Sequence, residues 1–156
     1  MQIRSMLLEG RSGHVAGRQL LEQMYREMTG QPMPPILTTP RGKPYFAEGD
    51  VHFSVSHTKK RVFCVLSNRP VGIDAEEQDR EIDLRLGEKI LSHGERERYE
   101  NATDRRAALL RLWVLKEATV KCSGDGLRGY PNHTDFSPED SRIQEIDNCF
   151  VAVIEE

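Results

Sequence analysis

Two carboxylates separated by one residue are the first feature of this sequence that could do chemistry. Asp74 and Glu76 lie in the run Val71-Gly-Ile-Asp-Ala-Glu, which has the composition of a β-strand. Side chains two residues apart leave the same face of a strand, so both carboxylates are placed to hold one cation. The alternative interpretation is surface acidity, because a charged stretch from Glu77 to Asp83 follows directly.

A second charged pair lies in a segment that is otherwise apolar. Residues 104–122 carry apolar side chains around nearly the whole circumference of a predicted helix, which is typical of a helix buried on most sides. Glu117 and Lys121 stand one turn apart on this helix, and a simple ion pair there would contribute only about 0.3–0.5 kcal/mol. A third carboxylate converging on Asp74 and Glu76 would instead complete an all-oxygen site, which favours Mg²⁺. Lys121 would then be a positive charge for a donor phosphate beside the metal.

Further side chains are candidates for binding phosphate, namely Arg18, Lys43, Ser56 and His57. Each also has a purely structural interpretation. Lys43-Pro44 is typical of a turn, and a histidine at the end of a strand often only packs. The residues alone leave both interpretations open.

The elements that must position these side chains are short strands and two longer helices. A strand is predicted over residues 2–8, and an amphipathic helix over residues 14–29 ends at Gly30. The proline-rich stretch 31–44 is predicted to be a loop. Further strands are predicted at residues 51–57, 61–67, 71–76, 132–136, 142–146 and 149–154. The first three of these are expected to form an antiparallel meander.

Local signals mark the ends of the helices in the second part of the chain. Ser92 and Glu95 have the spacing of a capping box, and Ser123-Gly124 ends the helix of residues 104–122. Gly124, Gly126 and Gly129 follow a helix, whereas a phosphate-binding glycine run precedes one, so we expect a helix stop and a tight turn.

These elements predict an α+β fold in a single domain spanning residues 1–156. The domain is expected to consist of two similar small halves, about residues 1–68 and 69–156. In each half a helix packs on a short antiparallel sheet.

Composition narrows the class of protein. The 156 residues are about one domain long, and 37% of them are apolar, which suffices for a compact core. The net charge of −3 gives no basic footprint, so nucleic acid is not an expected partner. Three well-separated cysteines indicate reduced thiols, and neither a signal peptide nor a membrane-spanning stretch is predicted. We therefore expect a cytoplasmic protein with no membrane partner.

The order of the motifs resembles that of a known family. The motifs are Gly42-Lys-Pro, Phe53-Ser-Val-Ser-His, Val71-Gly-Ile-Asp-Ala-Glu and Trp113-Val-Leu-Lys-Glu-Ala-Thr-Val-Lys, followed by Gly124-x-Gly-Leu. Over about residues 14–137 they resemble the 4′-phosphopantetheinyl transferases, specifically the surfactin-synthetase-activating (Sfp-like) type. In the shorter holo-acyl-carrier-protein synthase type, the first two motifs come after the helix motif.

This resemblance implies a pseudo-twofold fold and a specific reaction. Phosphopantetheine would pass from the donor coenzyme A to a serine hydroxyl of an acyl, peptidyl or aryl carrier protein, releasing adenosine 3′,5′-bisphosphate. Asp74, Glu76 and Glu117 would hold Mg²⁺ on the pyrophosphate, and Glu117 would also help to deprotonate the serine. Lys121 would neutralise the charge that builds on the pyrophosphate.

The same resemblance implies the coenzyme-binding residues. Lys43 would lie near the adenine and the phosphates, while Ser56 and His57 would receive the 3′-phosphate. Arg18, in the first helix, is carried over as a further coenzyme-binding residue.

Two other functions are compatible with these residues. One is a different Mg²⁺-dependent phosphotransferase, and the other is a catalytically silent module that binds coenzyme A or a carrier protein. Because one chain encodes both halves of the predicted site, we expect a monomer, unlike the one-half synthases that assemble their sites between subunits.

Overall fold

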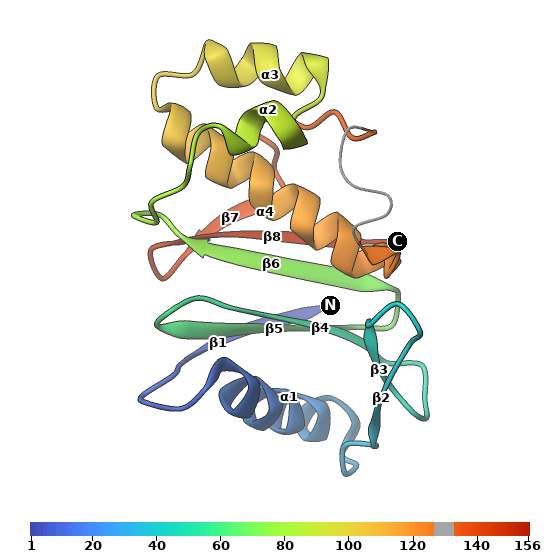
Figure 1. The fold of residues 1–156 in the computed structure, drawn as a ribbon. Coiled ribbons are helices and arrows are strands. Elements are labelled where there is room, and N and C mark those ends of the chain that lie inside the picture. Colours follow the sequence, from blue (N-terminus) through green and yellow to red (C-terminus); the bar gives the residue numbers. More distant parts are fainter. Residues whose placement is uncertain (127–132) are drawn as a thin grey trace.

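The computed structural model describes residues 1–126 and 133–156 (Figure 1). Its elements, in chain order, are β1 (Gln2–Leu7), α1 (Gly13–Thr29), β2 (Ile36–Thr38), β3 (Pro44–Phe46), β4 (His52–His57), β5 (Arg61–Ser67), β6 (Val71–Glu77), α2 (Leu86–Ile90), α3 (His93–Glu100), α4 (Arg105–Ser123), β7 (Ile143–Ile146) and β8 (Cys149–Glu155). The predicted mixture of helices and antiparallel strands is confirmed.

Two three-stranded antiparallel sheets lie at the centre of the molecule, and a long helix covers the outer side of each (Figure 1). The first sheet has the order β1-β5-β4 and carries α1, whereas the second has the order β6-β8-β7 and carries α4. Successive side chains of β5 point to opposite faces of the first sheet, so β5 contacts α1 on one face and the second sheet on the other. Phe63 and Val65 pack against the second sheet, while Val62 and Leu66 pack against α1.

The antiparallel pairing of β4 with β5 is confirmed. Strand β6 does not continue this sheet, so the three-stranded meander expected over residues 51–76 is wrong. Strand β5 is central and both of its edges are already paired, with β1 and with β4. Strand β6 therefore pairs with β8. Its other edge meets β4, where the Ser54 hydroxyl accepts a hydrogen bond from the Ile73 amide at 3.1 Å. The Ser56 hydroxyl does the same for the Ala75 amide at 3.2 Å.

The two long helices begin and end within about one residue of their predicted bounds. Ser12 caps the start of α1 and Asp104 caps the start of α4, each through its side-chain oxygen. Gly30 and Gly124 end these helices in the left-handed conformation, with φ of 72° at both, which glycine adopts without strain. Gly129, which was also predicted to lie in a turn, is outside the described residues.

Two other stretches differ from their prediction. The predicted loop of residues 31–44 contains β2, which pairs with β3 in a separate hairpin. Proline is tolerated there because Pro44 is the first residue of its strand. Residues 133–136 form no strand, because the Phe136 amide donates to the Glu95 carboxylate at 2.9 Å instead of joining a ladder. Residue 132, where that strand was predicted to start, lies outside the described part of the chain.

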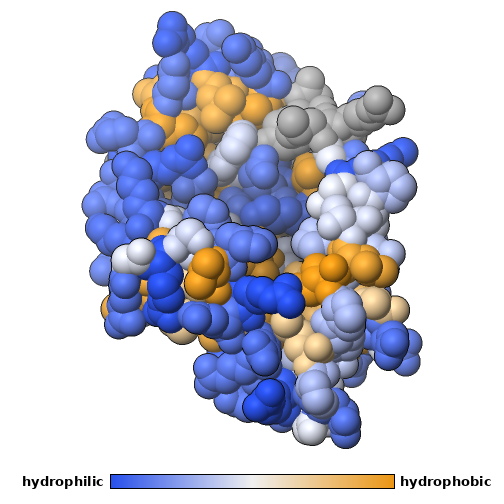
Figure 2. Space-filling view, turned by 60° about the horizontal axis from the view of Figure 1, so that its bottom comes forward, coloured by the Kyte–Doolittle hydropathy of each residue, from blue (hydrophilic) through white to orange (hydrophobic). Residues whose placement is uncertain are grey.

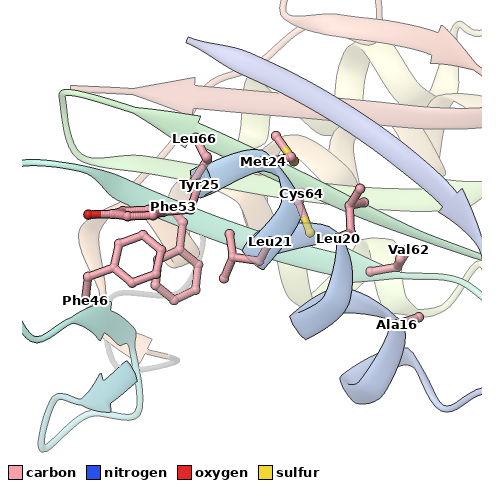
Figure 3. Close-up of a cluster of buried hydrophobic side chains, with 10 residues drawn as sticks. All are labelled: Ala16, Leu20, Leu21, Met24, Tyr25, Phe46, Phe53, Val62, Cys64 and Leu66. Atoms are coloured by element: carbon pink, nitrogen blue, oxygen red, sulfur yellow. The ribbon is translucent and has the colours of Figure 1, made fainter. Parts of the chain in front are cut away.

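The core between α1 and the first sheet combines aliphatic and aromatic side chains (Figure 3). Tyr25, Phe46 and Phe53 gather at one end of it, with ring centroids 4.9 Å apart for the first two and 4.4 Å apart for the last two. Such tilted contacts are favourable for aromatic rings. Phe46 belongs to β3, so this contact fastens the β2–β3 hairpin to α1. The three cysteines are buried and none forms a disulfide, as expected.

Hydrophilic side chains cover most of the face shown in Figure 2, and hydrophobic ones gather in a few patches. This agrees with a content of charged residues of 30%. Among the described helices, none combines the length and the apolar character needed to cross a bilayer.

Candidate functional site

The candidate site forms where β6 meets both α4 and β4. Asp74 and Glu76 leave the same face of β6, as strand alternation predicts, and both interact with residues of α4. Lys121, in the last turn of α4, donates to Asp74 Oδ1 at 2.7 Å. Ser56 on β4 donates to the same oxygen at 2.9 Å. One carboxylate therefore joins three elements that are distant in the sequence.

A glycine allows α4 to approach β6 closely enough for this contact. A Cβ atom added at Gly72 would clash with the Ala118 carbonyl and the Cys122 amide of α4. Any larger residue at this position would push the helix away from the strand. The ammonium of Lys121 then reaches Asp74 on β6.

The second oxygen of Asp74 is buried and has no hydrogen-bond partner among the described residues. The Asp74 side chain is only 8% exposed. Leaving a buried polar atom unsatisfied costs about 1–3 kcal/mol, and more when it is charged. A bound cation would satisfy this oxygen. The site therefore fits a hard cation with oxygen ligands, such as Mg²⁺.

Glu76 is surrounded by groups that change its proton affinity. Burial raises the pKa of the Glu76 carboxyl above its usual value. The guanidinium of Arg80 opposes this rise in pKa, and the neighbouring Asp74 carboxylate adds to it. The indole of Trp113 donates a hydrogen bond to Glu76. Sequence reasoning missed Arg80, although its position four residues after Glu76, in the charged stretch, was a signal.

Glu117 lies on α4 one turn before Lys121 and is partly buried. In residues 1–126 and 133–156, no group of three or more His, Cys, Asp or Glu side chains is arranged to hold a metal ion. The structure brings Asp74 and Lys121 together and places Glu76 within electrostatic reach of both. The convergence of all three carboxylates on one cation stays a prediction.

Ser56 and His57 face opposite sides of β4. Ser56 faces β6, whereas the imidazole of His57 lies against Gly13 in the first turn of α1, where a Cβ atom would clash with the ring. The N-terminus of a helix carries partial positive charge, which suits an anion. His57 and Glu76 also share a cavity of about 740 Å³, and its wall carries both basic residues (Lys59, Lys60 and Arg80) and acidic ones (Glu77, Asp79 and Glu81).

Lys43 lies at the other end of the site. Its alkyl chain approaches Gly124, and its ammonium donates to the Cys122 carbonyl in the last turn of α4. With Lys121 it lines a cavity of about 280 Å³ between the β2–β3 hairpin and α4. Arg18 is exposed on α1, which the first sheet separates from β6 (Figure 1).

A buried ion pair supports α4 on the side that faces α3. The side chains of Glu95 and Lys116 are 0% exposed, and their charged atoms are 2.7 Å apart. Lys116 also donates to Thr134 at 2.7 Å. Burial lowers the pKa of Lys116, and the hydrogen bond with Glu95 opposes this change. Glu95 also completes the predicted capping box with Ser92, which is confirmed. Sequence reasoning missed the partnership of Glu95 with Lys116.

Comparison with known proteins gives a consistent result. Residues 70–151 match the model of the 4′-phosphopantetheinyl transferase superfamily. The 4′-phosphopantetheinyl transferase gsp of Aneurinibacillus migulanus is 36% identical over 90 residues, which are 55% of this chain and 36% of that protein. The 4′-phosphopantetheinyl transferase psf-1 of Bacillus pumilus is 34% identical over 116 residues, which are 71% of this chain and 49% of that protein. The 4′-phosphopantetheinyl transferase Sfp of Bacillus subtilis (strain 168) is 30% identical over 89 residues, which are 55% of this chain and 39% of that protein.

The chain spans about half the length of these relatives, or less. The segment 70–151 includes Asp74, Glu76, Glu117 and Lys121. The four other candidate residues, Arg18, Lys43, Ser56 and His57, precede it.

Proposed function

Because this chain belongs to the 4′-phosphopantetheinyl transferase superfamily, we propose that it transfers the phosphopantetheine group of coenzyme A to a carrier-protein serine. The acceptor would be an acyl, peptidyl or aryl carrier protein. The contact between Lys121 and Asp74, beside Glu76, is the observation that carries this proposal. An ammonium fixed next to two carboxylates suits a reaction in which negative charge develops on a pyrophosphate.

The proposed reaction breaks one P–O bond and forms another. The serine oxygen attacks the phosphorus that carries the pantetheine group, and the bond from this phosphorus to the bridging pyrophosphate oxygen breaks. The electron pair of that bond leaves with adenosine 3′,5′-bisphosphate, and the serine proton passes to Glu117. Lys121, held by Asp74, neutralises charge on the leaving phosphate.

Asp74, Glu76 and Glu117 would hold Mg²⁺ in this proposal. The Asp74 oxygen that lacks a hydrogen-bond partner within residues 1–126 and 133–156 supports a cation at this position. When bound, the ion supplies positive charge to the pyrophosphate oxygens.

The coenzyme would extend from this centre towards basic side chains. Lys43 is proposed to lie near the adenine and the phosphates, and the cavity that it shares with Lys121 supports this placement. His57 is proposed to bind the 3′-phosphate, supported by its position against the first turn of α1. Ser56 and Arg18 belong to the proposed set through the family resemblance alone, because the Ser56 hydroxyl is engaged by Asp74 and the Ala75 amide and Arg18 lies on α1.

The same proposal extends to the organisation of the whole chain. Residues 1–156 would act as one domain whose halves, about 1–68 and 69–156, are related by a pseudo-twofold axis. The two helix-covered sheets support this relation. The working form would be a cytoplasmic monomer.

Intact-mass spectrometry of the carrier protein tests the proposed reaction. An apo carrier protein incubated with coenzyme A, Mg²⁺ and this protein should gain the mass of one phosphopantetheine group, and a metal chelator should prevent the gain. Neither another phosphotransferase nor a silent binding module would add this mass. A panel of fatty-acid, polyketide and peptide-synthetase carriers would identify the preferred acceptor. Absence of the product with every carrier would contradict the proposal.

Substitutions at the centre test the assigned residues. Asp74→Ala, Glu76→Ala and Glu117→Ala should each lower the transfer rate at least about a hundredfold while the fold is retained, because these groups act in the transition state. Glu97→Ala, at an exposed position of α3, is the matched control. Near-normal transfer by a folded Glu117→Ala protein would remove Glu117 from the site.

A further inference from the structure

Arg80 has no role in the function proposed above, yet its guanidinium forms an ion pair with the Glu76 carboxylate. The Glu76 side chain is 16% exposed, whereas that of Arg80 is 44% exposed. Arg80 therefore reaches from the solvent side to a carboxylate that is mostly buried.

The backbone at Arg80 is held by hydrogen bonds, whereas its side chain is partly exposed and forms its ion pair with Glu76. The Arg80 amide donates to the Glu77 carbonyl at 2.9 Å, and the Arg80 carbonyl accepts from Arg106 of α4 at 3.3 Å. Arg106 also donates to the Gln78 carbonyl, so α4 holds the whole turn. The half-exposed guanidinium can therefore leave Glu76 without any movement of the backbone.

The charges around β6 explain why a guanidinium lies there. Asp74 and Glu76 are like charges on one face of a strand, and each has its own counter-ion. Lys121 serves Asp74 at 2.7 Å, and Arg80 serves Glu76. A divalent cation would bring positive charge to the same oxygens, and it would be repelled by a guanidinium that stayed in place.

We propose that Arg80 is an internal counter-ion of Glu76 that competes with the divalent cation for this carboxylate. Metal binding displaces the guanidinium from Glu76 within the cavity that Arg80 already lines, where Glu77, Asp79 and Glu81 offer it other carboxylates. Arg80 is thus a positioning residue, which holds Glu76 in the metal-free protein and sets the affinity for the cation. The inference rests on the proposed metal site at Asp74, Glu76 and Glu117.

Binding of Mn²⁺ alone, without coenzyme A, tests this competition without any readout of activity. Free Mn²⁺ is measured by electron paramagnetic resonance during titration of the wild type and of Arg80→Gln at low ionic strength. Loss of the guanidinium should tighten binding roughly three- to tenfold, a range that allows for solvent screening of a half-exposed pair. Arg80→Lys keeps the charge and should return the affinity towards that of the wild type.

Arg85→Gln is the matched control. It removes the same charge from the same segment, but Arg85 pairs with Asp83, at 2.7 Å, and not with Glu76. Its Mn²⁺ affinity should equal that of the wild type. An equal gain in Mn²⁺ affinity in Arg85→Gln would overturn the inference, because the change in net charge alone would then explain the effect.

Asp74→Asn, introduced into the wild type and into Arg80→Gln, tests whether the measured Mn²⁺ binding occurs at this site. It should abolish Mn²⁺ binding in both proteins. Equal or weaker affinity of Arg80→Gln would overturn the competition and leave the proposed metal site standing. Binding that survives Asp74→Asn, or no binding to any of the proteins, would overturn the inference together with the proposed metal site.

Discussion

The carboxylate of Asp74 uses its two oxygens differently. Oδ1 accepts hydrogen bonds from both Lys121 and Ser56, whereas Oδ2 is buried without a partner among the described residues. Two donors on one oxygen leave the other available to a cation without breaking either contact. Asp74 can therefore keep one orientation before and after a cation binds, which is what a preorganised site requires.

At His57 we expect a change in donor preference. If His57 binds the 3′-phosphate, His57→Ala should lower kcat/KM for coenzyme A about tenfold or more, because a charge-assisted hydrogen bond is worth about 1.5–3 kcal/mol. The value for 3′-dephospho-coenzyme A should change little. His52→Ala, at the exposed opposite end of β4, is the control. An equal loss with both donors would make His57 a structural residue that only packs on Gly13.

Helix α4 carries charged groups that serve different neighbours. Lys121 reaches β6, and Lys116 pairs with Glu95 of α3 in a fully buried contact. Rotation of α4 about its axis would separate this pair and leave two buried charges without partners, which is strongly unfavourable. The Glu95–Lys116 pair therefore fixes the rotation of α4 and, through it, the direction of Lys121.

A double-mutant cycle measures this pair. Lys116→Met should lower the free energy of unfolding by about 3–5 kcal/mol, because it leaves the Glu95 charge buried and unpaired. Glu95→Gln, which retains an acceptor for the Phe136 amide, should recover much of the loss when combined with Lys116→Met. Urea unfolding of the wild type, the two single variants and the double variant gives the coupling free energy between the two side chains. Strictly additive losses would show that the two side chains do not act as a pair.

Asp135 should contribute to stability in a pH-dependent way. A hydrogen bond from Arg98, and a second from Ser92, lower the pKa of Asp135 below its usual 3.8. The folded state then binds this proton less tightly than the unfolded state. The stabilisation is therefore complete above pH 3.8 and is lost as the pH falls through the lowered value.

Asp135→Asn should remove this part of the pH dependence. Its free energy of unfolding, measured by urea denaturation between about pH 7 and pH 2, should lie below that of the wild type at neutral pH. The difference should shrink in the acid range. Parallel curves for the two proteins would show that Asp135 has the same proton affinity in both states.

Helix ends were predictable because their signals are local. The capping box at Ser92 and the glycine stops at Gly30 and Gly124 lie within a few residues of the ends that they mark. Strand partners were not predictable in this way. Composition identifies residues 71–76 as a strand, but the pairing with β8 depends on β5 having both edges occupied.

The candidate site also has features that follow from local sequence and features that depend on long-range packing. The shared face of Asp74 and Glu76 follows from strand geometry, so sequence predicted it. The donation of Lys121 and Ser56 to one oxygen of Asp74 depends on how two layers pack, which no local pattern contains. Gly72 was the available signal, because a glycine inside a strand marks a close approach of backbone.

The whole molecule places its candidate site at the junction of two layers. Apolar side chains from β5, β6 and β8 fill the space between the two sheets, and Val65, Ile73 and Val151 are among them. The site lies at the border of this apolar contact, where β4, β6 and α4 meet. One chain therefore supplies every contact described for Asp74.

We expect a single chain to be the active species. Sedimentation equilibrium should give the mass of one chain, and the transfer rate per molecule should stay constant as the protein concentration is raised. A rate per molecule that increases in step with trimer formation would indicate that the site is completed by another subunit.

The two serine hydroxyls on β4 also protect β6 from aggregation. The edge of β6 that faces away from β8 would otherwise present unpaired amides, and such an edge is a template on which a strand from a second molecule can add. Ser54 and Ser56 occupy the amides of Ile73 and Ala75, but a hydroxyl offers no backbone on which a ladder could continue. The strand that carries Asp74 and Glu76 is thus closed to foreign strands while the face with these two carboxylates stays available.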